Sequence, residues 1–196
     1  VTGCTGRGST TFTHYKEVRM ARKKSPEAPR PQPKGRSFHL EFKNTAQKVA
    51  CAAFDQHDIL FMVGPAGTGK TLLATAFAIG EIVAKRRKKI ILTRPIVEAG
   101  ESLGYLPGTF GEKVAPYMTP MFDSIERCVG PEGPDREKVD RAIEVAPVAY
   151  LRGRTFNDAV CIFDEAQNAT LTQLKLFMTR LGENSKMIIT GDPFQT

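Results

Sequence analysis

The chain has 196 residues, of which 41% are hydrophobic, and a formal net charge of +7 at pH 7. This length predicts one domain, or one domain with a tail, and the apolar fraction suffices for a buried core. The longest apolar run, LLATAFAIGEIVA at 72–84, is interrupted by Gly80 and Glu81 and is shorter than the ~20 residues of a membrane-spanning helix. We therefore expect a soluble, cytoplasmic protein without a membrane segment.

The excess positive charge belongs to residues 1–43, which hold ten Lys and Arg residues against three Asp and Glu residues. Within this part, ARKKSPEAPRPQPKGR at 21–36 is rich in proline and contains little apolar surface. Such a segment cannot offset its ordering entropy by burial, so we expect a disordered basic arm over 1–43. The arm suits either nucleic-acid phosphates or a solubilising role, and its composition does not separate the two.

The segment KEVRM at 16–20 bears on where translation begins. One way to encode Lys-Glu-Val, one further residue and Met is a purine-rich ribosome-binding sequence at the right distance from a start codon. We therefore expect translation to start at Met20, with residues 1–19 read from upstream DNA.

The cysteines are far apart in the sequence, form no C-x-x-C pair, and in two cases lie in apolar runs typical of buried thiols. The four are Cys4, Cys51, Cys128 and Cys161. This pattern predicts free thiols in a reducing compartment and no zinc site.

From residue 44 onward, strand-like and helix-like segments alternate, which predicts an α/β domain with a mainly parallel sheet. In chain order we expect a helix at 44–56, a strand at 59–63, a helix at 70–84, a strand at 89–93, helices near 113–128 and 134–143, strands at 146–151 and 159–163, a helix at 170–182 and a strand at 186–190. Ligands in such sheets bind beyond the carboxyl ends of the strands, so functional residues are expected there.

The first strand runs into GPAGTGKT, a glycine-rich turn that opens a helix. Glycine permits backbone dihedrals that turn successive N–H groups inward, and the helix start adds partial positive charge, so the turn predicts an ATP or GTP phosphate site. Lys70 would reach the β- and γ-phosphates, and the Thr71 hydroxyl would join the shell of Mg²⁺. The nucleotide-binding residues are Gly64, Pro65, Ala66, Gly67, Thr68, Gly69, Lys70 and Thr71.

The strand AVCIF ends in DEAQN, which places two carboxylates at a strand tip. Asp164 is predicted to hold magnesium, and Glu165 to orient or deprotonate the attacking water. The next strand ends in GDPFQ, whose Asp192 and Gln195 lie where a loop can hydrogen-bond a γ-phosphate. Two acids at a strand end could instead cap a helix, and G-D-P could be a plain turn, but the neighbouring phosphate loop favours the functional interpretation.

Arginines follow two other strands, in TRP at 93–95 and in RGRT at 152–155. Arg94, Arg152 and Arg154 suggest contacts to phosphates of the nucleotide or of a nucleic-acid strand, although pairing with a local carboxylate is about equally expected for each. The run KRRKK at 85–89 follows a helix, where cations are favoured, and it lies opposite the phosphate site. Gln47 could read the edge of adenine, but its spacing alone is a weak signal.

Taken together, NTAQ, GPAGTGKT, GESLGYLPG, LRGRTF, CIFDEAQNAT and MIITGDPFQ resemble the PhoH family of P-loop ATPases, the phosphate starvation-inducible PhoH-like proteins, over 44–196. The resemblance implies a three-layer P-loop NTPase fold similar to the RecA-like first motor lobe of superfamily 1 helicases. It also implies that Gln47 reads adenine, that Gln167 and Gln195 contact the γ-phosphate, and that the two arginine loops face nucleic acid.

The family continues past its last motif, whereas this chain ends at Thr196. We therefore expect the domain at 44–196 to be incomplete at its C-terminus, without the arginine that those further residues would supply toward the transition state. An arginine from another subunit raises turnover by several orders of magnitude in some P-loop enzymes. We expect a ring-like homo-oligomer for the complete protein.

Three functions stay open on the sequence alone. The leading one is a magnesium-dependent ATPase coupled to single-stranded RNA or DNA, with Glu165, Lys70 and Gln195 as catalytic residues. The second is a nucleic-acid-binding module that uses ATP only as a switch. The third, a small-molecule kinase, is disfavoured because the Asp-Glu pair and the G-D-x-x-Q loop are not typical of kinases.

Overall fold

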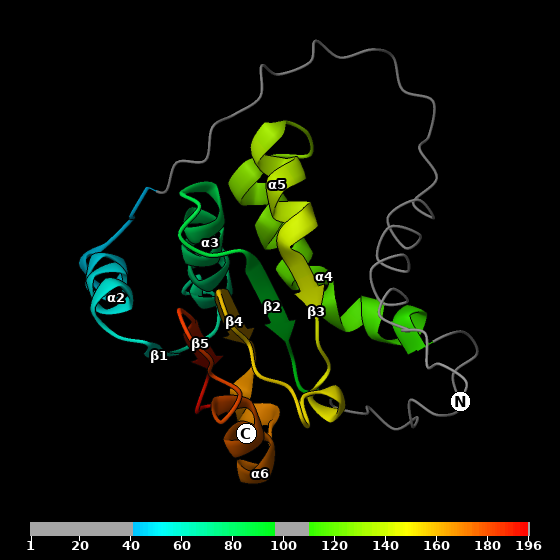
Figure 1. Ribbon diagram of the computed structural model, residues 1–196. Coiled ribbons are helices and arrows are strands. Elements are labelled where there is room, and N and C mark those ends of the chain that lie inside the picture. The colour runs from blue at the N-terminus through cyan, green and yellow to red at the C-terminus, as the bar shows by residue number, and fades with distance from the viewer. Residues whose placement is uncertain (1–40, 97–109, 196) are drawn as a thin grey trace, which may run out of the picture. The chain divides into compact units, whose positions relative to one another are not determined.

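The computed structural model describes residues 41–96 and 110–195 (Figure 1). Five strands form one sheet in the order β1-β5-β4-β2-β3, and each neighbouring pair is parallel. The strands are β1 (Ile59–Val63), β2 (Lys89–Thr93), β3 (Ile143–Val145), β4 (Ala159–Phe163) and β5 (Lys186–Gly191). Because all strands run in one direction, their carboxyl ends share one edge of the sheet and their amino ends share the other.

The helices are α2 (Thr45–Gln56), α3 (Lys70–Val83), α4 (Phe110–Val129), α5 (Pro134–Ala142) and α6 (Leu171–Met178), with short 3-10 turns η1 (Val148–Tyr150) and η2 (Ala166–Asn168). An α/β fold with a parallel sheet is confirmed. The predicted basic arm, apart from 41–43, and the segment GESLGYLPG lie outside the described residues.

Both faces of the central strands are buried, as apolar runs such as AVCIF predict for a parallel sheet. On one face, Phe163 lies 4.8 Å from Phe177 of α6, measured between ring centroids, within a cluster that includes Cys161. Side chains alternate along a strand, so the equally buried Ile162 points to the opposite face. Helix α3 contacts β2, β4 and β5, and it covers that second face.

The predicted strand at 146–151 is wrong, because the strand lies three residues earlier. Ile143–Val145 pairs with Ile90–Leu92, and the Ala146 N–H still donates to the Leu92 carbonyl oxygen. Pro147 follows, and proline has no N–H to continue a ladder, so the chain turns into η1.

Helix α6 is shorter than the predicted 170–182. It begins after Thr170, which forms a capping box with Gln173, and it ends at Met178. The chain leaves the helix because residues 180–182 bond to another segment: the Phe156 N–H donates to the Arg180 carbonyl, and the Gly182 N–H donates to the Phe156 carbonyl. The remaining elements lie within three residues of their predicted bounds.

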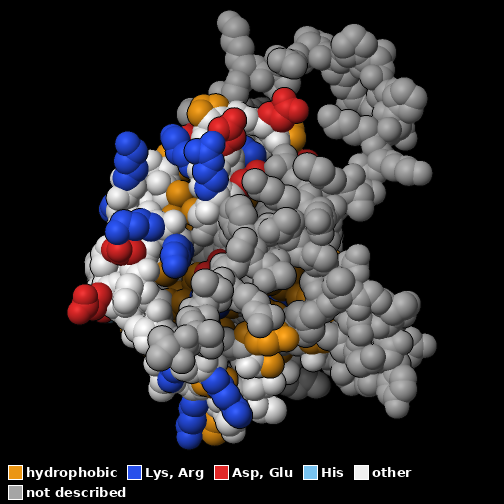
Figure 2. Space-filling view, turned by 45° about the vertical axis from the view of Figure 1, so that its right-hand side comes forward, with side chains coloured by type: hydrophobic (Ala, Val, Ile, Leu, Met, Phe, Trp, Pro, Cys, Tyr) orange, Lys and Arg blue, Asp and Glu red, His pale blue; other side chains and the backbone are white. Residues whose placement is uncertain are grey.

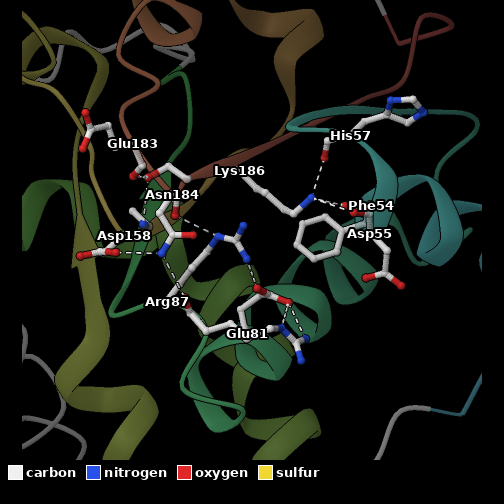
Figure 3. Close-up of polar contacts among 12 residues, drawn as sticks. Phe54, Asp55, His57, Glu81, Arg87, Asp158, Glu183, Asn184 and Lys186 are labelled. Atoms are coloured by element: carbon white, nitrogen blue, oxygen red, sulfur yellow. Dashed lines mark hydrogen bonds and ion pairs between the residues drawn. The ribbon is translucent and has the colours of Figure 1, made fainter.

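At the amino edge of the sheet, Lys186, the first residue of β5, binds the end of α2 (Figure 3). Its Nζ lies 2.6 Å from the carbonyl oxygen of Phe54, 2.8 Å from that of His57 and 3.3 Å from that of Asp55. These carbonyls belong to the end of α2, where a helix has no internal donors left. Lys186, which is 8% exposed, therefore fastens α2 to the sheet.

A second network at the same edge joins the end of α3 to the turns before β4 and β5 (Figure 3). Buried Glu81 accepts hydrogen bonds from Arg86 and Arg87, and Arg87 also donates to the Asn184 carbonyl oxygen at 3.1 Å. Asp158 accepts from Asn184 at 2.8 Å and from Lys88 at 2.7 Å. Arg86, Arg87 and Lys88 of the run at 85–89 are thus paired within the chain, at the edge opposite the phosphate loop.

Candidate nucleotide-binding site

The loop between β1 and α3 has the backbone that a phosphate site requires. Gly67 and Gly69 have φ values of 76° and 85°, a region that favours glycine, and a Cβ on Gly67 would meet nothing within 4 Å. Position 67 therefore favours glycine for its backbone conformation and not for lack of space. Gly69 is the N-cap of α3 and supplies no side-chain hydrogen bond, so the first N–H groups of the helix can donate to an anionic ligand.

Lys70 lies at the start of α3 with its Nζ turned back toward the loop. This atom lies 2.7 Å from the carbonyl oxygen of Gly64 and 2.8 Å from that of Pro65. The Thr68 hydroxyl also donates to Pro65, at 2.9 Å, and the Gly64 N–H bonds to the Gly191 carbonyl at the tip of β5. The ammonium group is therefore held over the loop that would receive phosphates.

Thr71 and Asp164 are brought together, although 93 residues separate them in the sequence. Asp164 Oδ1 accepts hydrogen bonds from the Thr71 hydroxyl at 2.8 Å and from the Thr190 hydroxyl at 2.5 Å. Thr190 was not singled out from the sequence, and its only signal is a polar residue near the end of the apolar strand MIIT. Two hydroxyls thus orient one oxygen of a carboxylate that is 1% exposed.

The other oxygen, Asp164 Oδ2, is buried and has no hydrogen-bond partner within the described residues. A buried carboxylate oxygen without a donor is costly unless a cation compensates it. The guanidinium of Arg94 forms an ion pair with this oxygen at 3.7 Å but does not donate a hydrogen bond to it. A hard oxygen beside the Thr71 hydroxyl fits a magnesium ion, the role predicted for these two residues.

Glu165 lies directly after Asp164 in a left-handed conformation, with φ 55°. Its Oε2 accepts from Gln167 Nε2 at 2.5 Å, and its Oε1 lies 3.5 Å from Arg94 Nη2. Gln167 in turn accepts from the Asp192 N–H at 3.0 Å. Arg94, Glu165 and Gln167, with the backbone of Asp192, therefore form one chain of contacts across the tips of β2, β4 and β5.

The side chain of Gln47 lies beside the phosphate loop, as the resemblance implies. A Cβ built on Gly69 would lie 3.9 Å from Gln47 Nε2, and Gln47 Oε1 accepts from the Lys43 N–H at 2.7 Å. The N-cap Asn44 accepts from the Gln47 N–H and starts α2 at this point. The amide nitrogen is thus near the loop, and its contact with adenine stays a prediction.

The polar groups of the turn after β5 form hydrogen bonds within that turn. Asp192 is 3% exposed, and its Oδ1 accepts from the Phe194 N–H at 3.0 Å. Gln195 is exposed, and its N–H donates to the Asp192 carbonyl at 3.3 Å. Asp192 thus shapes the turn and meets Gln167 through its backbone, while the γ-phosphate contact of Gln195 stays a prediction.

The three arginines predicted to face nucleic acid have different surroundings. Arg152 is exposed. Arg154 pairs with Glu144 at 2.5 Å and lies over the Phe156 ring, 4.7 Å from its centroid. Arg94 lies beside Asp164 and Glu165. Two of them thus have the local carboxylate partner that was equally expected from the sequence.

The cysteines of the described residues, Cys51, Cys128 and Cys161, carry free thiols, and Cys161 is buried. Burial raises the pKa of Cys128 to about 11 and that of Cys161 to about 12, and desolvation followed by the charge of Asp55 raises that of Cys51.

Across 41–96 and 110–195, the structure contains no group of three or more His, Cys, Asp or Glu side chains that could hold a metal.

The charged side chains of α5 form ion pairs along the helix. In Figure 2, Lys and Arg side chains stand among Asp and Glu side chains over the upper part of the face in view. Along α5, Arg136 pairs with Asp140, Lys138 with Asp135, and Arg141 with Glu137.

Within the part of the chain that the structure describes, no helix is long and apolar enough to cross a membrane.

The chain matches a family model described as PhoH-like protein over residues 39–196. It is 51% identical to a PhoH-like protein of Bacillus subtilis over 162 residues, which cover 83% of this chain and 50% of the relative. It is 44% identical to Protein PhoH of Escherichia coli K12 over 153 residues, 76% of this chain and 43% of that protein. The chain thus spans about half the length of these curated relatives.

A solved structure, the Sulfolobus solfataricus SWI2/SNF2 ATPase core in complex with dsDNA, matches with a TM-score of 0.50 and 17% identity, over 76% of this chain and 31% of that chain. At this identity the likeness shows the fold alone, and it agrees with a P-loop NTPase architecture. The match over 39–196 and the identities near 50% establish the family. The chain belongs to the PhoH-like protein family.

Proposed function

We propose that this chain is a magnesium-dependent ATPase domain whose hydrolysis is coupled to a nucleic-acid strand. The observation that supports this most is the convergence at one sheet edge of a phosphate loop with Lys70, a Thr71–Asp164 pair and Glu165. Phosphoryl transfer depends on positioning and on charge stabilisation, and these residues supply both.

Each residue has a separate task. The loop N–H groups and Lys70 bind the β- and γ-phosphates, and Gln47 contacts the base. Thr71 and Asp164 hold Mg²⁺, which neutralises phosphate charge when bound. Glu165 accepts a proton from the attacking water, and Gln167 and Gln195 contact the γ-phosphate.

The nucleic-acid part of the proposal is supported by Arg152, an exposed residue in the turn that follows η1. An exposed arginine there can contact a strand backbone without sequence preference. The likeness to an ATPase core solved with dsDNA is consistent with such a partner. The ring-like homo-oligomer of the complete protein stays a prediction.

The test is phosphate release from ATP by the 196-residue chain, measured with and without single-stranded RNA, single-stranded DNA or duplex DNA. We expect Glu165→Gln to lower turnover by roughly 10²–10⁴-fold, the range for losing a general base, and to leave ATP binding intact. We also expect one of the nucleic acids to raise the parent rate, and Arg152→Ala to reduce that stimulation.

Other results would redirect the proposal. A Glu165→Gln variant that hydrolyses at the parent rate removes Glu165 from the mechanism. Tight ATP binding without phosphate release supports the switch function. Transfer of phosphate from ATP to a metabolite instead of water supports a kinase.

A further inference from the structure

Both carboxylate oxygens of Glu165 are engaged. Gln167 Nε2 lies 2.5 Å from Oε2, and Arg94 Nη2 lies 3.5 Å from Oε1. A general base needs a lone pair directed at the proton that it removes. The structure therefore shows Glu165 in an arrangement in which neighbouring donors hold both oxygens.

Arg94 reaches this position from the tip of β2. Its Nη1 lies 3.7 Å from Asp164 Oδ2 and 3.3 Å from the carbonyl oxygen of Tyr117 in α4, and its side chain is 20% exposed. One guanidinium thus faces the magnesium ligand and the general base, and a backbone carbonyl of a helix. A planar group with five N–H donors can make these three contacts, which a lysine cannot.

The contacts of Arg94 with the two acids are longer than the contact of Arg154 with Glu144. Its distances to Asp164 and Glu165 are 3.7 and 3.5 Å, whereas Arg154 lies 2.5 Å from Glu144. Charge-assisted hydrogen bonds are strongest at about 2.7–2.9 Å, so the Arg94 contacts can be exchanged more readily for others. A phosphate group is a suitable competitor, because arginine binds phosphates and carboxylates through the same donors.

We propose that Arg94 is a positioning residue that holds Glu165 at rest, and that a nucleic-acid phosphate binding Arg94 releases Glu165 for hydrolysis. This inference rests on the proposed function. It gives Arg94 a role in linking nucleic-acid binding to ATP hydrolysis, beyond contact with the nucleic acid. By thermodynamic linkage the coupling is reciprocal: whatever weakens the Arg94–Glu165 contact favours nucleic-acid binding, and the reverse.

The first test is kinetic and uses Arg94→Gln, Arg94→Lys and the control Arg141→Gln, which removes an exposed ion pair on α5. We expect Arg94→Gln to raise basal phosphate release roughly two- to fivefold, the scale of a weak ion pair. Stimulation by single-stranded RNA should fall toward onefold. Arg94→Lys should restore part of the stimulation, and the control should match the parent.

The second test measures binding without turnover. Fluorescently labelled single-stranded RNA is titrated with the parent, Glu165→Gln, Arg94→Gln and the double variant. We expect Glu165→Gln to bind RNA severalfold more tightly, because it frees Arg94, and the double variant to lose that gain.

Distinct outcomes separate the inference from the proposed function. If the parent is stimulated by RNA but Arg94→Gln has an unchanged or lower basal rate, the positioning role is overturned and the proposed function stands. If the effects of the two substitutions on RNA affinity simply add, the coupling is also refuted. A parent chain that releases no phosphate from ATP with single-stranded RNA, single-stranded DNA or duplex DNA overturns both.

Discussion

Two lysines illustrate how the two edges of the sheet differ. At the amino edge, Lys186 is 8% exposed and bonds to three carbonyl oxygens at the end of α2. At the carboxyl edge, Lys70 bonds to two carbonyl oxygens of its own glycine-rich loop. The first lysine joins two elements of the fold, whereas the second stays within a single loop.

The aspartates at the two edges follow the same division. Asp158 accepts hydrogen bonds from Asn184 and Lys88 at the amino edge. Asp164, at the carboxyl edge, keeps one buried oxygen without a hydrogen bond in the described part of the chain. The comparison teaches that Lys186 and Asp158 at the amino edge bind other elements of the fold, whereas Asp164 at the carboxyl edge keeps one oxygen that can bind a cation.

The largest expected effect is on nucleotide binding, through Lys70→Ala. Removing a charge that contacts phosphates weakens binding by roughly 30-fold or more. The free energy of unfolding should change little, because the carbonyl partners of Lys70 lie in a largely exposed loop. Titration with a fluorescent ATP analogue, beside urea unfolding, measures both quantities. A variant that binds ATP normally would show that this lysine does not contact phosphates.

The next effect, through Lys186→Met, is on the stability of the fold and not on nucleotide binding. Its carbonyl partners at the end of α2 would lose their donor, so we expect the free energy of unfolding to fall by about 2–4 kcal/mol. The exposed Lys175→Met on α6 is the matched control and should change stability by less than about 0.5 kcal/mol. Urea unfolding monitored by circular dichroism gives the comparison. Equal stability of the two variants would contradict the anchoring role.

The smallest effect concerns pH at the amino edge. Hydrogen bonds from Asn184 and then Lys88 lower the pKa of Asp158. A carboxyl group with a lowered native pKa contributes stability that is present above its unfolded pKa, ~3.9, and is lost as pH falls through the native value. We expect Asp158→Asn to lose less stability than the parent over this acidic range. An identical pH dependence of urea unfolding would exclude this contribution.

The sequence predicted the elements better than the contacts between them. The strands β1, β2 and β4 have the predicted bounds, because each is an apolar run between turn residues. The strand before Pro147 was misplaced, because the apolar run AIEVAPVAYL extends across the proline and hides the point where pairing ends. The phosphate loop and the Asp164–Glu165 pair were recognisable because their residues are adjacent in the sequence.

Contacts between distant segments could not be predicted in the same way. Thr190 bonds to Asp164 across 26 residues, and Lys186 bonds to Phe54 across 132 residues. Arg94 was placed at the correct strand tip, but its direction toward Glu165 depends on how β2 and β4 lie side by side. Such partners follow from strand order, which no local pattern encodes.

The most direct test of the central claim is the melting temperature of the chain with ATP, measured with and without magnesium, for the parent and for Asp164→Asn. A ligand that binds only the folded state raises the melting temperature by an amount that grows with the logarithm of its concentration relative to its Kd. We predict that magnesium adds to the stabilisation by ATP in the parent and that Asp164→Asn loses this increment. If Asp164→Asn retains the full increment, the buried oxygen of Asp164 is not reserved for a metal-bound nucleotide.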